Sequence, residues 1–186
     1  HLQRFVRFSP GQKMAQSAPT FSSSSSSLDS VYVDGSKGEG GGQVLRNSIS
    51  YASILGKNLR IDNIRAGRKK PGLKAQHLTG LLLATDLCGG RLEGGKLHST
   101  EIQYAAATTT GKRKNRVDEL REVTGDTKTA GSICLLLQAA LPCALFGSES
   151  PTKLVLKGGT NASMAPQYDY WTHIFLPTLQ RQMGAG

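Results

Sequence analysis

The sequence predicts an α/β fold in which a strand–helix–strand–helix unit occurs twice. Segments with strand-like alternation and segments with helical spacing of apolar residues follow one another in the same order in both halves. Two landmarks also recur at one separation, because Asp126 lies 92 residues after Asp34 and Gly159 lies 92 residues after Gly67. We interpret this agreement as an internal duplication.

The first copy is expected to hold six elements. A short strand, VYVD, precedes a glycine-rich loop, and a helix then runs to about Leu55, where Gly56 ends it. Pro71 suits the first turn of a second helix, which Gly89 and Gly90 end. The predicted elements are a strand at 31–34, a helix ending near 55, a strand at 58–64, a helix at 71–88, and two short strands at 90–97 and 99–105, possible partners in a hairpin.

The second copy repeats this order after Asp126. A small-residue loop, TKTAGS, leads into the apolar helix ICLLLQAALPCALF; the strand TKLVLKGGT follows, and another helix opens near MAPQYDYW. We therefore divide the chain into a disordered Ser-rich tail at 1–30, the first copy at 31–105, a basic insertion at 106–122 and the second copy at 123–186. The insertion carries four basic residues between 112 and 116, and either contacts nucleic acid or forms a solvated loop.

Composition narrows the class of partner. The 186 residues are 38% hydrophobic and carry a formal net charge of +10. This charge favours an anionic partner such as nucleic acid or a nucleotide, with a merely basic surface as the alternative. Three cysteines without CxxC spacing predict a reducing compartment, no disulfide framework and no zinc site. No apolar run has the length of a membrane span, so no membrane partner is expected.

The glycine-rich stretch GEGGGQ at 38–43 is the first candidate for chemistry. It matches neither GxGxxG nor GxxxxGK[ST], so neither common nucleotide-binding loop is present. A glycine-rich turn that opens a helix still leaves backbone N–H groups free for an anion. Glu39 within it would repel phosphate. It either holds a metal ion or a substrate hydroxyl, or is a surface residue that caps the helix.

The stretch IRAGRKKPGLKAQH at 64–77 is a second candidate. Arg65 and Arg68 precede a predicted helix start, where guanidinium groups and free backbone donors together can hold a phosphate. His77 and Gln76 follow on the second turn, and Arg46 lies near the glycine-rich loop. In the second copy the corresponding loop lacks arginine. Gln138 lies within an apolar helix there, so its amide makes either a core hydrogen bond or a ligand contact.

These residues resemble the RNA 3'-terminal phosphate cyclase family, in its true cyclase branch. The resemblance is carried by VDGSKGEGGGQVLR, IRAGRKKPGLKAQHL, DLCGGRLEG, STEI, DTKTAGSICLLLQAALP and LKGGTNASMAPQYDY. It implies repeated βαβαββ units, similar to those of the enolpyruvyl transferases. It also implies an RNA-processing ligase that uses ATP to convert an RNA 3'-phosphate into a 2',3'-cyclic phosphodiester, through an adenylylated histidine and an RNA-phosphate–AMP intermediate.

The resemblance also implies site residues. The RNA-phosphate-binding residues would be Arg46, Arg65, Arg68, Gln76 and His77. Gln138 and Pro166 would line the ATP site, and Glu39 would lie by a divalent metal such as Mg²⁺ or by the terminal ribose. The alternative is a non-catalytic RNA-binding or ribosome-assembly protein of the cyclase-like sister group. That group looks unlike this chain at RAGR and QH.

Two departures from the family pattern stand out. The basic insertion is longer than the family usually has, and family members are roughly twice as long as this chain. The chain thus resembles the N-terminal half of a cyclase, and the nucleophilic histidine is expected beyond Gly186. We accordingly expect the isolated chain to be inactive as a cyclase. Resemblance to eukaryotic members suggests the nucleus, in particular the nucleoplasm, with the cytoplasm as the alternative; the oligomeric state is left open.

Overall fold

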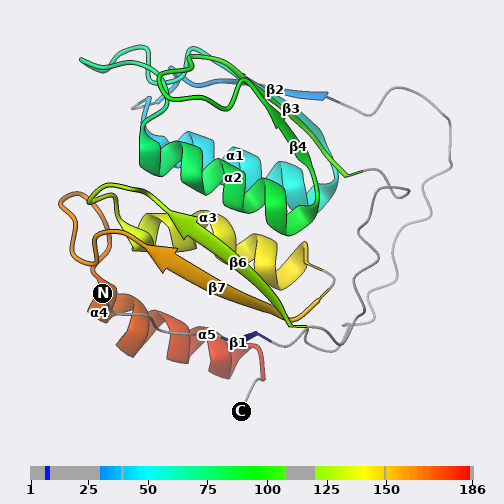
Figure 1. The fold of residues 1–186 in the computed structure, drawn as a ribbon, viewed down its shortest axis with the longest axis vertical. Helices are drawn as coiled ribbons and strands as arrows, with labels where there is room; N and C mark the ends of the chain where they lie inside the picture. Colours follow the sequence, from blue (N-terminus) through cyan, green and yellow to red (C-terminus); the bar gives the residue numbers. More distant parts are fainter. Residues whose placement is uncertain (1–6, 9–29, 39, 108–119, 149, 185–186) are drawn as a thin grey trace, which may run out of the picture.

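Two β-sheets enclose a middle layer of helices (Figure 1). The computed structural model describes residues 7–8, 30–38, 40–107, 120–148 and 150–184. The middle layer holds three helices of equal length, which are α1 (Gly42–Leu55), α2 (Ala75–Cys88) and α3 (Ile133–Phe146). The structure confirms the predicted mixture of helices and sheets.

The first sheet has four strands in the order β2-β3-β5-β4. Their bounds are β2 (Ser30–Asp34), β3 (Asn58–Asp62), β4 (Arg91–Glu93) and β5 (Ile102–Ala105). Strands β2 and β3 are parallel and joined through α1, whereas β5 is antiparallel to both β3 and β4. The predicted pairing of the last two strands is therefore confirmed, although residues 94–101 make a longer connection than a tight hairpin.

The second sheet has three strands in the order β1-β7-β6. Strands β6 (Arg121–Asp126) and β7 (Thr152–Lys157) are parallel and joined through α3, and β1 (Arg7–Phe8) is antiparallel to β7. Strand β1 lies within the segment expected to be a tail. Ser30, the first residue of β2, belongs to the same segment. The other residues of that segment and most of the basic insertion lie outside the described residues.

A short composite helix near the end of the described residues packs on the outer side of α3. It consists of α4 (Tyr168–Tyr170), a π-helical turn η1 (Trp171–Phe175) and α5 (Leu176–Gln182). Trp171 packs with Cys134 and Leu141 of α3 in a small apolar cluster. Because α3 is covered on this side and on its inner side, it is apolar almost all round, as a fully enclosed helix must be.

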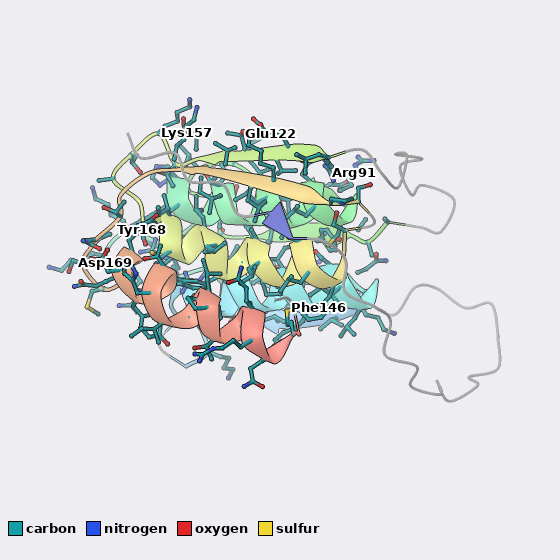
Figure 2. All side chains as sticks on the ribbon, turned by 90° about the horizontal axis from the view of Figure 1, so that it is seen from below. Arg91, Glu122, Phe146, Lys157, Tyr168 and Asp169 are labelled. Atoms are coloured by element: carbon teal, nitrogen blue, oxygen red, sulfur yellow. The ribbon has the colours of Figure 1, made fainter. Side chains whose placement is uncertain are left out.

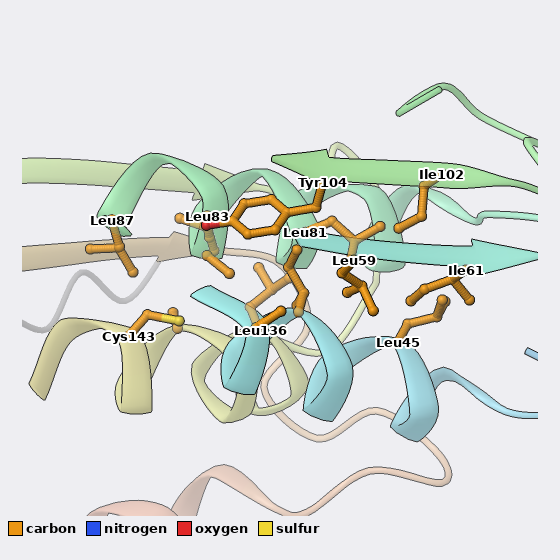
Figure 3. Packing of buried hydrophobic residues seen from close by; sticks show 14 of the residues in the cluster. Leu45, Leu59, Ile61, Leu81, Leu83, Leu87, Ile102, Tyr104, Leu136 and Cys143 are labelled. Atoms are coloured by element: carbon orange, nitrogen blue, oxygen red, sulfur yellow. The ribbon is translucent and has the colours of Figure 1, made fainter. Parts of the chain in front are cut away.

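The main core lies between the first sheet and the three helices (Figure 3). Leu45 and Ile49 of α1 and Leu59 and Ile61 of β3 are at most 2% exposed. Leu136 joins them from α3, so one continuous core contains residues of both copies. The helices end where glycines were predicted to end them, because Gly56 and Gly89 adopt left-handed φ angles of 64° and 71°.

Helix α2 begins at Ala75, so the prediction that it starts at Pro71 is wrong. The reason lies at Gly72, which has a φ of 77° and packs against the backbone of His98. Its N–H donates a 2.8 Å hydrogen bond to the Ile64 carbonyl. This turn keeps residues 71–74 out of the helix, and the segment between β3 and α2 is an ordered loop.

The duplication is visible in the ends of the parallel strands. Asp34 and Asp126 close β2 and β6, and each accepts a hydrogen bond at Oδ1 from the backbone N–H two residues later. Gly67 and Gly159 are not equivalent in this sense, because Gly67 lies five residues after β3 and Gly159 lies two residues after β7. Asp34 and Asp126 thus occupy equivalent structural positions, whereas Gly67 and Gly159 share only their separation in the sequence.

Candidate anion-binding site

The N-terminal ends of α1, α2 and α3 meet at one end of the middle layer. A Cβ placed on Gly42, in the first turn of α1, would lie 2.6 Å from His77 Nε2 of α2. Gln76 Oε1, also on α2, accepts a 2.8 Å hydrogen bond from the backbone N–H of Ser132, the N-cap of α3. None of the three helices has an acidic residue in its first turn. Their partial positive charges therefore add at this end without a neutralising carboxylate in those turns.

Gly42 shows why the loop before α1 is rich in glycine. Besides its approach to His77, a Cβ on Gly42 would lie 2.9 Å from Arg46 Nη1. Only a residue without a side chain leaves both groups where they are. Among the described residues no side-chain hydrogen bond caps this helix at Gly41, and uncapped backbone N–H groups at a helix start can bind a ligand.

Arg46 projects from α1 into the space between α1 and α3. Its Nε donates a 2.8 Å hydrogen bond to Gln138 Oε1, and its Nη2 donates one of 2.8 Å to Gln43 Oε1. Burial lowers the pKa of Arg46 from its usual value. Within the described residues no carboxylate lies within ion-pair distance of its guanidinium. Arg46 is thus a half-buried cation held by amides, which leaves its charge for an external anion.

Arg65 holds the loop between β3 and α2 from inside. It is 8% exposed, has a φ of 55°, and its Nη1 donates 2.9 Å hydrogen bonds to the carbonyls of Lys70 and Gly72. Burial, and next the charge of Arg68, lower its pKa. Arg68 itself is exposed, and its Nη2 would lie 3.6 Å from a Cβ on Gly41. One arginine therefore shapes the loop and the other reaches over the start of α1.

His77 is a neutral hydrogen-bond donor in this setting. Burial, followed by the charges of Arg65, Arg46 and Lys74, lowers its pKa to about 4. Its Nδ1 accepts a 3.3 Å hydrogen bond from the backbone N–H of Lys74. An acceptor Nδ1 in a neutral imidazole assigns the proton to Nε2, and Nε2 is the atom that faces Gly42. We define the anion site as Gly42, Arg46, Arg65, Arg68 and His77.

Two further predicted residues lie beside this set. Gln76 uses its carbonyl oxygen to join α2 to the start of α3, and Gln138 uses its own to orient Arg46. Pro166 lies half-buried on the loop between β7 and α4. Figure 2 shows Lys157, the last residue of β7, and Tyr168, the first of α4, on one side of the molecule and Phe146 on the other. The ATP-site roles of Gln138 and Pro166 remain predictions.

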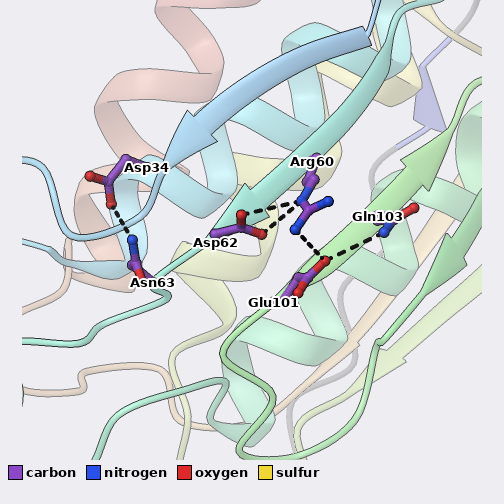
Figure 4. A network of polar contacts seen from close by, with 6 residues as sticks. All are labelled: Asp34, Arg60, Asp62, Asn63, Glu101 and Gln103. Atoms are coloured by element: carbon purple, nitrogen blue, oxygen red, sulfur yellow. Dashed lines mark hydrogen bonds and ion pairs between the residues drawn. The ribbon is translucent and has the colours of Figure 1, made fainter.

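A contrasting arrangement covers the outer face of the first sheet (Figure 4). There Arg60 pairs with Asp62 and Glu101, each at 3.1 Å, and Asn63 donates a 3.3 Å hydrogen bond to Asp34. Two neighbouring carboxylates balance the single positive charge of Arg60. That surface therefore lacks the unbalanced positive charge that the anion site concentrates.

Sequence reasoning missed two supporting residues. Gln43 fixes the second branch of Arg46, and Ser132 connects the two copies through its backbone and caps α3 through its hydroxyl. The i, i+3 spacing of Gln43 and Arg46 was a usable signal. Nothing in the sequence brings Ser132 to Gln76, 56 residues away.

Glu39 lies outside the described residues. Among the residues that the structure describes, no three or more His, Cys, Asp and Glu side chains gather as a metal-binding group. The described residues thus offer no protein cage for a metal ion, and we assign no residue to one. Within the same residues no helix is both long and apolar enough to cross a membrane.

The fold and the site define an α/β protein with a candidate anion-binding site at convergent helix N-termini. Comparison with known families then narrows the class: the model of RNA 3'-terminal phosphate cyclase matches residues 37–186. The chain belongs to the RNA 3'-terminal phosphate cyclase family. The family predicted from the sequence motifs is thereby confirmed.

Curated relatives agree with this assignment. The chain is 44% identical over 145 residues to a probable RNA 3'-terminal phosphate cyclase of Dictyostelium discoideum, covering 78% of this chain and 32% of the relative. It is 41% identical over 149 residues to an RNA 3'-terminal phosphate cyclase of Thermococcus sibiricus, covering 80% of this chain and 40% of that protein. For the protein of that name in a Nostoc strain the identity is 43% over 152 residues, covering 81% and 42%. The chain thus spans less than half the length of these relatives.

Proposed function

We propose that this chain supplies the RNA-end-binding part of an ATP-dependent RNA 3'-terminal phosphate cyclase. The observation that carries the proposal is the anion site, where two buried or half-buried arginines have no carboxylate partner among the described residues and lie beside three helix N-termini. A terminal phosphate carries up to two negative charges and presents three oxygens, and this set of donors matches both properties.

Each residue of the site has a distinct part in the proposal. Arg46 and Arg68 contact the phosphate oxygens, and the Nε2–H of His77 donates a third hydrogen bond. Arg65 acts mainly through the loop, since its Nη1 is already engaged with the Lys70 and Gly72 carbonyls. Gln76 keeps the starts of α2 and α3 together.

ATP belongs to the proposed reaction as the source of AMP, which activates the phosphate for attack by the neighbouring 2'-hydroxyl. We propose Gln138 and Pro166 as its contacts, together with a divalent metal ion such as Mg²⁺ bound mainly through the phosphates. His77 is a poor candidate for the adenylylated nucleophile. Its Nδ1 lone pair already accepts from Lys74, and its Nε2 carries the proton.

We also propose a nuclear location, which rests only on the resemblance to eukaryotic family members. Fractionation of cells that express the tagged chain tests this location.

The proposal is tested by RNA binding. Short labelled RNAs ending in a 3'-phosphate or a 3'-hydroxyl are titrated with the purified chain by fluorescence anisotropy. Replacing both Arg65 and Arg68 by Ala should weaken binding of the 3'-phosphate RNA by roughly 2–5 kcal/mol, the scale for losing charged partners. The 3'-hydroxyl RNA should change much less. The matched control is Arg60→Ala, whose side chain is paired with carboxylates on the outer sheet face.

Equal losses for both RNA ends would show that these arginines contact only the RNA backbone. An Arg60→Ala variant as weak as the double variant would show that general charge and not the anion site governs binding. The non-catalytic alternative, an RNA-binding or ribosome-assembly protein, predicts no preference for a 3'-phosphate. The preference itself therefore separates the two functions.

A further inference from the structure

A cavity of about 360 Å³ lies at the opposite end of the middle layer from the anion site. It is formed where α1, α2 and α3 end, and its lining includes Ser53, Leu87, Cys88, Arg121, Phe146 and Gly147. Phe146, the last residue of α3, marks this end of the molecule, away from Lys157 and Tyr168 (Figure 2). None of the residues of the anion site lines it. We call it the C-terminal cavity.

Two of the three cysteines meet beside this cavity. Cys88 ends α2, lines the cavity and is half-buried, whereas Cys143 lies in the last turn of α3 and is buried. A Cβ on Gly147 would overlap the Cys88 sulfur and would lie 3.0 Å from the Cys143 carbonyl oxygen. The sulfur of Cys88 thus packs against the turn of α3 that carries Cys143. Figure 3 shows Cys143 facing Leu83 and Leu87 of α2.

The pKa values of the two thiols shift in opposite directions. A hydrogen bond with the Cys143 thiol is the main cause that lowers the pKa of Cys88, and the positive charge of Arg121 acts in the same direction. The hydrogen bond with Cys88, followed by burial, raises the pKa of Cys143. Arg121 is fixed at this place by a 2.8 Å ion pair with Asp86. Cys88 lines the cavity and Cys143 is buried, so access and the pKa shifts both favour Cys88 as the nucleophile and Cys143 as its protonated partner.

Cys134 provides an internal contrast. It is buried near the start of α3, far along the helix from Cys143, and its sulfur lies 3.8 Å from the Thr160 carbonyl oxygen. Burial raises its pKa. It does not line the C-terminal cavity, so it lacks both the access and the partner that Cys88 has.

We propose that Cys88 and Cys143 are a redox-modifiable pair that a peroxide entering the C-terminal cavity converts into a disulfide between α2 and α3. In the first step the Cys88 thiolate attacks one peroxide oxygen. The O–O bond breaks, hydroxide leaves and takes up a proton, and Cys88 becomes a sulfenic acid. In the second step the Cys143 sulfur attacks the Cys88 sulfur, the S–O bond breaks, and water leaves with the Cys143 proton. The two thiols lose two electrons and the peroxide yields two waters.

The new bond would join α2 and α3, whose opposite ends lie beside the anion site. At the helical rise of 1.5 Å per residue, Cys88 lies about 20 Å from the first residue of α2 and Cys143 lies about 15 Å from the first residue of α3. The modification therefore does not require contact with RNA or ATP. It is independent of the proposed function and would hold for a chain that binds no RNA.

The test uses the purified full chain, treated with hydrogen peroxide and alkylated without reduction. Measured before alkylation, the intact mass should fall by two hydrogen atoms, and peptide mapping after alkylation should find a Cys88–Cys143 link that dithiothreitol removes. Cys134→Ser is the matched control and should behave like the wild type. Cys143→Ser should stop at the sulfenic acid, which dimedone traps on Cys88, and Cys88→Ser should give neither product. Before oxidation, iodoacetamide should alkylate Cys88 about 10-fold faster than Cys134.

The wild-type chain alone can overturn the proposal, so it does not depend on the folding of any variant. Oxidation of Cys134 before Cys88 would contradict it, as would links that join only separate chains. A Cys88 that stays reduced while peroxide is consumed elsewhere would also contradict it. Circular dichroism before and after peroxide checks that the link forms in the folded chain.

Discussion

Replacing Gly42 by Ala probes the anion site with a single methyl group. The added carbon would lie 2.6 Å from His77 Nε2 and 2.9 Å from Arg46 Nη1, whereas unbonded heavy atoms prefer about 3.5–4.0 Å. His77 and the tip of Arg46 must therefore move by about 1 Å. A donor displaced by that amount loses most of a hydrogen bond to a charged acceptor, which contributes about 1.5–3 kcal/mol.

We expect Gly42→Ala to raise the Kd for a 3'-phosphate RNA by roughly 10- to 100-fold. The cost to the free energy of unfolding should be only about 1 kcal/mol, the low end for overpacking, because the far end of a side chain can shift. Fluorescence anisotropy measures the first quantity and chemical denaturation the second. Gly67→Ala is the matched control, since no atom lies within 4 Å of a Cβ at Gly67.

An unchanged Kd in a folded Gly42→Ala chain would refute the reasoning, because the two donors would then not need their observed places. Equal weakening of RNA binding by Gly67→Ala would also refute the reasoning. Any methyl group added near this end of the molecule would then weaken binding, and the contacts of Gly42 would not explain the effect.

Three further results are expected. Gln138→Leu removes the acceptor of the Arg46 Nε–H and should weaken 3'-phosphate RNA binding about 3- to 10-fold. Gln138→Glu should weaken binding more, because its carboxylate neutralises Arg46. Tighter binding by the Glu variant would exclude a charge role for Arg46. The pKa of His77 is lowered from its usual 6.5 to about 4, so between these pH values the unfolded chain binds more protons than the folded chain. The free energy of unfolding should therefore fall by no more than about 3 kcal/mol as the pH drops from 6.5 to 4. His77→Gln should flatten this part of the plot of unfolding free energy against pH. The chain is incubated with Mg²⁺ and with ATP that is labelled in its α-phosphate. No acid-labile AMP should remain on the chain, because His77 has neither ring nitrogen free for attack. Stoichiometric labelling would contradict this expectation.

Local signals in the sequence predicted much of the fold. Glycines at 56 and 89 end their helices because left-handed backbone is cheapest for glycine, and these positions can be found without knowing the fold. The start of α2 could not be found in this way. Pro71 is a good first residue for a helix in isolation, but the positive φ of Gly72 and its contact with His98 override that preference.

The candidate site likewise has a part that the sequence predicts and a part that depends on the packing of the helices. Arg65, Arg68, Gln76 and His77 lie within 13 residues, so their proximity could be predicted from the sequence alone. The contacts that join the two copies could not, because hydrogen-bond partners such as Arg46 and Gln138 are 92 residues apart. Those contacts depend on how α1 and α3 pack, which no local pattern encodes.

The hydrogen bond between Arg46 and Gln138 joins the two copies at the anion site. The guanidinium comes from the first copy, and the amide oxygen that accepts from it comes from the second, so the first copy alone does not hold Arg46 in its observed place. A half-buried arginine without this acceptor would lose a hydrogen bond to a charged group, which contributes about 1.5–3 kcal/mol. The second copy therefore builds the anion site through an amide, although every cation of the site comes from the first copy.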